Sequence, residues 1–286
     1  MDSSPNSEDL DTRNHDVRKI SWAEVPPDTL VEVFRWLSVE DRLRTLPQIC
    51  KAWRKASLDP GCWQFVDLTE WCEDQSGEVK DRMVKLVVER SYGGLQELRV
   101  SNLDGDASLQ FLAQSGLTSM RTLCIPGSFV TDSGLCELIL TLPNLEHLDI
   151  SKCGGITSKA LEVIGQNCKS FSRLDWVMWP MHRAQSLPDD CEGMAIAQNM
   201  PKLRHLVISA GQLSNSSCKA IRNNCPLLEC LDEVSDYDDD SYSYYDSFED
   251  EDVYDWDDEL DDVWEGDDYV VEYDSEDDDD DGIFDL

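Results

Sequence analysis

The sequence predicts an α/β fold in which short parallel strands alternate with helices in a curved solenoid, with three short helices before it and an acidic tail after it. Two observations lead to this prediction. Six short apolar segments recur at a nearly constant interval, and helical periodicity follows them. We divide the 286 residues into a polar, disordered start (1–20), a helical module (21–63), a capping unit (64–94), a repeat region (95–231) and the tail (232–286).

The repeated segments share the spacing L-x-x-L-x-L, with other apolar residues replacing some of the leucines. They are LQELRV (Leu95–Val100), MRTLCI (Met120–Ile125), LEHLDI (Leu145–Ile150), FSRLDW (Phe171–Trp176), LRHLVI (Leu203–Ile208) and LECLDE (Leu228–Glu233). Their fourth-position leucines are 25, 25, 26, 32 and 25 residues apart. An interval of 20–29 residues with this spacing is typical of leucine-rich repeats. A single unit cannot bury its own apolar faces, so we expect about six strand–helix units to stack.

Helix signals follow the strands. In TDSGLCELILTLPNL, Thr131 or Asp132 is a candidate N-cap, and Leu135 and Leu138 lie on one helical face. The segment TSKALEVIGQNCKSF repeats this pattern from Thr157 or Ser158. These signals predict one helix for each unit.

Two segments depart from the regular repeat. The fourth unit is about seven residues longer than its neighbours, and we assign the extra length to a loop over Trp179–Glu192. Before the first repeat, Cys62–Leu68 and Glu78–Ser91 have the patterns of a strand and a helix. We expect this pair to cap the open N-terminal end of the solenoid.

The charge is concentrated in the tail. The chain has a formal net charge of −36, and residues 232–286 contain 29 Asp and Glu with no Lys or Arg. No basic surface is evident, so nucleic-acid binding is disfavoured. No run of about 18 apolar residues predicts a membrane span. The polar start does not resemble a signal peptide, so we expect a cytoplasmic or nuclear protein, or one found in both.

The tail combines its acids with 11 aromatic residues, as in YSYYDSFEDEDVYDWDDELDDVW. Self-repulsion and few aliphatic residues predict disorder. Two interpretations stay open: a solubilising tail, or a segment that binds basic proteins or a basic patch within its own complex.

The 11 cysteines are scattered singly, without a Cys-x-x-Cys pair, so a zinc site or a disulfide framework is poorly supported. Cys168 and Cys225 occupy the same position in two repeats, which indicates packing. No G-x-S-x-G, P-loop or H-E-x-x-H motif appears, and we therefore expect no catalytic activity, metal or cofactor.

The stretch from Val25 to Trp63 has the pattern of three short amphipathic helices. Pro26 and Pro27 suit a helix start, and Ser38 with Asp41 suits the cap of a second helix. About 40 residues cannot bury a sufficient core alone, so the module needs a partner surface. The apolar positions of the three helices are Leu30, Val33, Phe34 and Leu37; Leu43 and Leu46; and Ile49, Cys50 and Trp53.

This stretch resembles an F-box. The resemblance rests on Val25-Pro26, on the run Ile49-Cys50-Lys51-Ala52-Trp53-Arg54 and on Asp59-Pro60-Gly61-Cys62-Trp63. Val25 replaces the usual leucine, and Pro47 is tolerable only in the first turn of a helix. With the repeats and the acidic tail, the chain resembles the plant F-box/leucine-rich-repeat proteins.

The resemblance implies a non-catalytic substrate receptor of an SCF ubiquitin ligase. The F-box would bind a Skp-type adaptor, and through it a cullin and a RING subunit, while the repeats would hold an unidentified substrate protein. The residues implied to face the adaptor or to support that interface are Pro26, Leu30, Val33, Phe34, Leu37, Leu46, Ile49, Cys50 and Trp53.

Substrate-binding candidates are polar side chains that point outward from the strands, with one tryptophan beside the long loop. They are Arg99, His147, Asp149, Arg173, Asp175, His205 and Trp179. The alternative function is an acidic scaffold or chaperone whose tail binds basic proteins. A chaperone of that kind would not need the intact F-box motif.

Overall fold

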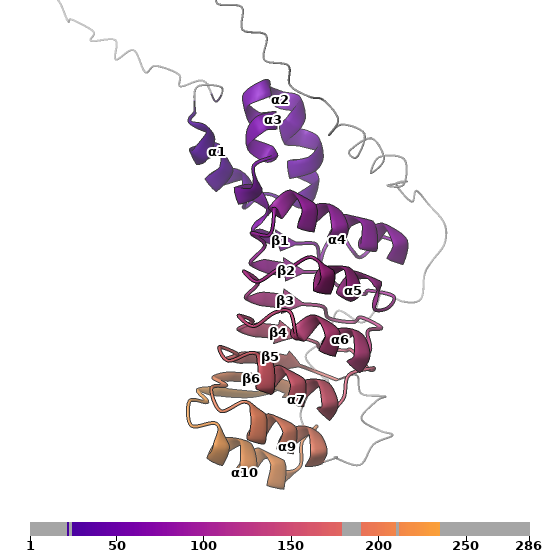
Figure 1. The fold of residues 1–286 in the computed structure, drawn as a ribbon, viewed down its shortest axis with the longest axis vertical. Helices are drawn as coiled ribbons and strands as arrows, with labels where there is room; N and C mark the ends of the chain where they lie inside the picture. Colours follow the sequence, from indigo (N-terminus) through magenta and orange to yellow (C-terminus); the bar gives the residue numbers. More distant parts are fainter. Residues whose placement is uncertain (1–21, 23–24, 179–189, 210–211, 235–286) are drawn as a thin grey trace, which may run out of the picture.

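A computed structural model describes residues 22, 25–178, 190–209 and 212–234. Its strands form one parallel sheet in the order β1 to β7, stacked along the long axis, with helices along one side (Figure 1). The strands are β1 (Phe65–Asp67), β2 (Glu97–Arg99), β3 (Thr122–Cys124), β4 (His147–Asp149), β5 (Arg173–Trp176), β6 (His205–Ser209) and β7 (Cys230–Val234). The predicted α/β solenoid is confirmed, and the capping unit contributes β1.

The repeat interval of the sequence becomes a row of leucines across the sheet. Leu98, Leu123 and Leu148 are register partners on neighbouring strands, and the row continues through Leu174 and Leu206. All five are fully buried. Each buried leucine side chain stabilises the fold by about 1.5–3 kcal/mol, so this row contributes a large part of the stability of the hydrophobic core.

A helix packs beside each strand from β1 to β6. The helices are α4 (Gly77–Ser91), α5 (Ala107–Gln114), α6 (Asp132–Ile139), α7 (Ser158–Asn167), α9 (Asp190–Asn199) and α10 (Asn215–Asn224). Thr131 and Thr157 cap α6 and α7, with side chains that accept hydrogen bonds from backbone N–H groups. The predicted loop over Trp179–Glu192 is wrong at its end, because Asp190–Glu192 form the first turn of α9.

An aspartate near the start of one helix links two of these units to the unit that follows. The Asp106 carboxylate accepts from the backbone N–H (2.8 Å) and the hydroxyl (2.6 Å) of Thr131. Asp132 makes the same pair of bonds to Thr157, at 2.9 and 2.6 Å. The N-cap of one helix is therefore held by the helix before it, which fixes the spacing of the stack.

The N-terminal module holds α1 (Pro27–Phe34), η2 (Asp41–Thr45), α2 (Leu46–Ile49), α3 (Lys51–Ser57) and η3 (Pro60–Trp63). The η2 segment is a π-helical turn, whose end lies just before Pro47. Pro47 has no amide hydrogen for the bond to the carbonyl four residues earlier, which explains why the regular α-helical pattern is interrupted there.

The third helix was predicted to carry Ile49 and Cys50, and this was wrong. Cys50 is extended (φ −162°, ψ 168°) and precedes the first turn of α3, while Ile49 ends α2. Ser38 caps the second helical segment as predicted, since its hydroxyl accepts from the backbone N–H of Asp41 at 3.1 Å.

The module continues directly into the solenoid. Cys62 and Trp63 of η3 are buried, and β1 begins two residues later and pairs with β2. At the other end, β7 extends to Val234, past the predicted end of the repeats. The predictions of disorder for residues 1–20 and for the tail beyond Val234 concern segments outside the described residues.

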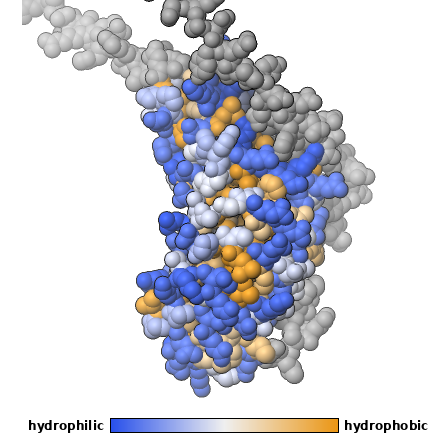
Figure 2. Space-filling model, in the orientation of Figure 1, coloured by the Kyte–Doolittle hydropathy of each residue, from blue (hydrophilic) through white to orange (hydrophobic). Residues whose placement is uncertain are grey.

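The viewed face of the molecule is mostly hydrophilic, with a band of apolar side chains near its middle (Figure 2). In the part of the chain that the structure describes, no helix is long and apolar enough to cross a bilayer.

Candidate functional site

Three of the predicted adaptor-interface residues form the core of the helical module. Leu30, Phe34 and Leu46 are at most 2% exposed. The Trp53 ring packs against Phe34 with 4.9 Å between ring centroids, and Trp22 meets the Trp53 ring edge-on at 6.0 Å. These side chains therefore hold the helices of the module together.

Other residues of the predicted set lie at the surface of the module. Pro26, Val33 and Ile49 are exposed, with 42% of Val33 and 53% of Ile49 accessible. Trp36 is 80% exposed and was not predicted. Exposed apolar side chains on so small a module are the expected feature of a surface that a partner covers. Leu37, Cys50 and Trp53 are partly buried.

A buried arginine, which we did not predict from the sequence, lies between the module and the solenoid. Arg42 is 4% exposed. Its guanidinium donates to the carbonyls of Leu37 (3.0 Å), Cys62 (2.6 Å) and Phe65 (3.3 Å), and it lies 5.5 Å from the centroid of the Trp63 ring. Burial lowers the pKa of Arg42 from its usual value.

Arg42 joins the end of the first helical segment, near in sequence, to η3 and β1, whose bonded carbonyls lie 20 and 23 residues further along the chain. Because a guanidinium presents several N–H donors in a rigid plane, one side chain can fix all three backbones. A signal was present in the sequence. Arg42 is three residues after Val39 and four before Leu46, both buried, which places it on the inward helical face.

Two rows of side chains cross the open face of the sheet. In one row Glu97, Thr122, His147, Arg173 and His205 are register partners. The second row consists of Asp67, Arg99, Cys124, Asp149, Asp175 and Val207. All six of the predicted substrate-binding residues that the structure describes therefore lie on this one surface.

His147, Arg173 and Asp175 form a connected cluster in these rows. The Asp175 carboxylate lies 2.9 Å from His147 Nε2 and 2.9 Å from Arg173 Nη2. Burial alone would raise the pKa of Asp175, but hydrogen bonds from His147 and Arg173 outweigh it and lower the pKa. Asp175 is nearly inaccessible, and its two contacts fix the orientation of the His147 and Arg173 side chains.

The other candidates are distributed along the same surface. Arg99 pairs with Glu97 at 2.6 Å and lies 4.0 Å from Asp67. Asp149 accepts from the backbone N–H of Ser151, and His205 Nε2 lies 4.0 Å from Glu229. Trp179 lies outside the described residues.

Three short side chains on or just after the strands are buried: Ser101, Cys124 and Ser209. Both serines lie where the chain turns away from the sheet, and their hydroxyls donate to the carbonyls of Thr69 and Met178. Cys124 is short, and burial raises its pKa to about 12, so it is not a nucleophile at neutral pH.

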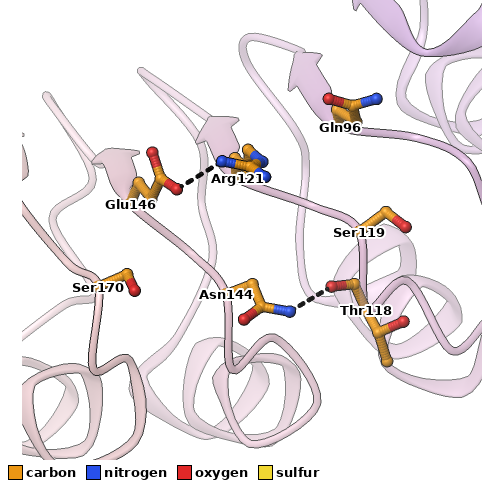
Figure 3. Close-up of a pocket in the computed structure, with 7 residues that line it drawn as sticks. All are labelled: Gln96, Thr118, Ser119, Arg121, Asn144, Glu146 and Ser170. Atoms are coloured by element: carbon orange, nitrogen blue, oxygen red, sulfur yellow. Dashed lines mark hydrogen bonds and ion pairs between the residues drawn. The ribbon is translucent and has the colours of Figure 1, made fainter.

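A polar groove of about 610 Å³ opens between the helix-to-strand loops on the edge where the strands begin. Figure 3 shows that its charged groups already face each other: Arg121 pairs with Glu146 at 2.9 Å, and Asn144 donates to the carbonyl of Thr118. The Arg121–Glu146 pair therefore leaves the groove without an unpaired charge among its lining residues.

Cys168 and Cys225 are packing residues, as predicted. Both are buried, and each thiol lies 3.4 Å from a carbonyl oxygen of the preceding unit, that of Leu142 or Met200. Burial raises both pKa values to about 11. Across the described ranges, no three His, Cys, Asp or Glu side chains are grouped so that they could hold a metal ion.

The comparisons with known proteins agree with the geometry. The F-box-like family model matches residues 22–69, which span the helical module and β1. F-box protein FBW2 of Arabidopsis thaliana is 36% identical over 213 residues, which are 74% of this chain and 67% of that protein. Putative F-box/LRR-repeat protein 22 and F-box protein SKIP19, from the same plant, are 32% and 31% identical, each over 74% of this chain and 68% of their own lengths.

The fold and the matched family model show that the protein is an F-box joined to a leucine-rich-repeat solenoid. The chain belongs to the plant F-box/LRR-repeat family.

Proposed function

We propose that this chain is the substrate-recognition subunit of an SCF-type ubiquitin ligase. The helical module binds a Skp-type adaptor, which connects to a cullin and a RING subunit, and the open face of the solenoid binds the substrate protein. The observation that carries the proposal is an F-box with exposed apolar side chains, fused without a linker to a leucine-rich-repeat sheet.

The chain acts by proximity and performs no bond chemistry of its own. Holding the substrate lysine near the charged conjugating enzyme replaces a bimolecular encounter with an effectively intramolecular one. This gain requires that the adaptor-binding module and the substrate-binding face keep a fixed relative position. The hydrogen bonds of Arg42 to the carbonyls of Cys62 and Phe65 support this requirement, because they fix the module against the first strand of the solenoid.

The test for adaptor binding uses surface residues, because substitution of Leu30 or Phe34 would disrupt the module itself. We expect the variant Val33→Glu/Ile49→Glu to lose at least tenfold in affinity for a Skp-type adaptor in a pull-down and in calorimetry. The matched control is Leu140→Glu, which changes a 63% exposed apolar residue on the convex side next to α6. Equal binding by wild type and by the Val33/Ile49 variant would refute the assigned surface.

The test for substrate binding uses the solenoid. Lysates are searched for proteins that the wild-type chain captures and that the variant His147→Ala/Arg173→Ala does not. The variant must keep adaptor binding, because its substitutions lie on β4 and β5, away from the module. If every captured protein is retained by the variant, the open face is not the substrate site. If a folded wild-type chain fails to bind the adaptor, the acidic-scaffold function gains support.

A further inference from the structure

Helix α3 carries three cations on one face. Lys51, Arg54 and Lys55 stand at positions i, i+3 and i+4, and all three are exposed. Leu58, the C-cap residue, continues the same stripe and is 42% exposed. The opposite side of the helix is buried through Ala56 and Ser57, so the four residues form an outward surface that we name the α3 basic stripe.

The cations of the stripe have no carboxylate partner within the described part of the chain. The helix KAWRKAS contains no acid, and no ion pair joins Lys51, Arg54 or Lys55 to an acidic side chain there. Arg54 donates only to the backbone carbonyl of Pro47, at 3.1 Å. Neighbouring like charges repel, so a polyanion bound along the stripe would relieve this repulsion.

The chain itself contains a matching polyanion. Residues 235–286 hold 27 Asp and Glu and no Lys, Arg or His. Aromatic residues alternate with the acids, most densely over residues 242–264. A segment that mixes acids with aromatics complements a surface that places cations beside an exposed leucine.

We propose that the α3 basic stripe is the docking surface for the acidic tail of the same chain. Figure 1 shows the module and α10 at opposite ends of the solenoid, and β7 is the last strand of the sheet. The six strand spacings between β1 and β7 amount to roughly 29 Å. Fifty-two residues can span roughly 170 Å when fully extended, so the tail is long enough to reach the module.

Helix α10 is the nearest competing surface, because it lies beside β7 and carries Lys219 and Arg222 without an acid of its own. It differs from α3 in its surroundings. The β7 residue Glu233 is close enough to α10 to act on the pKa of Cys218, which burial chiefly raises, and it opposes the effect of Arg222 there. Helix α10 thus presents two cations near the Glu233 carboxylate, whereas α3 presents three, and the carboxylate that follows it, Asp59, accepts from the backbone N–H of Gly61 at 2.8 Å.

Tail docking has a consequence for the F-box. Any ligand that covers α3 competes with the tail, and the tail has the high effective concentration of a covalently attached ligand. The proposal does not depend on adaptor binding, and it is tested without an adaptor.

The first experiment is zero-length cross-linking of the full chain with a carbodiimide, which joins lysine amines to carboxylates with loss of water. The tail has no lysine, so each tail cross-link reports a lysine elsewhere. We expect Lys51 and Lys55 to dominate the tail cross-links of the monomer at low salt, and these links to fall at least fivefold in 0.5 M NaCl, where surface charges are screened.

The second experiment measures binding of a fluorescent peptide of residues 235–286 to a chain truncated after Val234. We expect Lys51→Glu/Lys55→Glu to weaken binding about tenfold, which is the size expected for exposed ion pairs acting together. The matched control Lys219→Glu/Arg222→Glu should change it less than twofold. Circular dichroism and thermal unfolding check that each variant is folded.

Three results would overturn the proposal. Tail cross-links centred on Lys219 would place the tail on α10. Tail cross-links found only in a dimer band would place it on a second copy of the chain. A peptide affinity that Lys51→Glu/Lys55→Glu leaves unchanged would remove the stripe as the site, and with it the intramolecular contact.

Discussion

Replacing Arg42 should destabilise the joint between the F-box and the solenoid. The variant Arg42→Met keeps the length of the side chain but removes its donors, so the carbonyls of Leu37, Cys62 and Phe65 lose them. A buried acceptor left unsatisfied costs about 1–3 kcal/mol. Three carbonyls lose a donor, but the variant no longer bears the cost of burying a charged guanidinium, so we expect a net loss of about 3 kcal/mol in the free energy of unfolding.

Denaturant unfolding followed by tryptophan fluorescence measures this loss, since Trp63 lies under the guanidinium. Arg42→Lys should lose about half as much, because an ammonium lacks the planar fork that reaches three carbonyls. The exposed Lys51→Met in the same module should change stability by less than about 0.5 kcal/mol. A loss below about 1 kcal/mol for Arg42→Met would refute the role assigned to this residue.

Three further predictions follow from packing and charge. The pKa of Asp175 is lowered in the folded state, so its stabilising effect is present above its unfolded pKa of about 3.9 and is lost as pH falls through the folded value. The stability–pH curves of wild type and Asp175→Asn should therefore diverge at neutral pH and converge in acid, and parallel curves would contradict this. A Cβ on Gly165 would lie 2.4 Å from the carbonyl oxygen of Asn199, so Gly165→Ala should cost about 2 kcal/mol in thermal unfolding, whereas Gly105→Ala, in open space, should be neutral. Burial raises the thiol pKa to about 11 or 12 in six cysteines: Cys62, Cys72, Cys124, Cys153, Cys168 and Cys225. In the native protein at pH 8, a thiol reagent should therefore modify these six far more slowly than exposed Cys191. A rate at any of the six that equals the rate at Cys191 would contradict its burial.

The solenoid was predictable because each unit obeys the same physical requirement. A leucine at the centre of every strand must face the core, so Leu98, Leu123 and Leu148 repeat in sequence and then pair in register. The N-caps Thr131 and Thr157 were predictable for the same reason, since a helix starts at a fixed distance after each strand.

The interior of the module was less predictable, because periodicity shows which residues share a face but not how far the face is covered. Leu30 and Val33 belong to one apolar pattern, yet the first is buried and the second exposed. Arg42 looks polar in sequence and is buried because backbone carbonyls replace water around it. Which backbone carbonyls the Arg42 side chain reaches is decided by tertiary structure, and the spacing of residues in the sequence does not specify it.

Hydrogen exchange on a complex with a Skp-type adaptor tests the central claim most directly. The account predicts that the adaptor protects amides of α1, α2 and α3, while those of β4 to β6, on the proposed substrate surface, exchange at the rate of the unbound chain. Protection centred on the solenoid, or a folded chain that forms no complex, would contradict it.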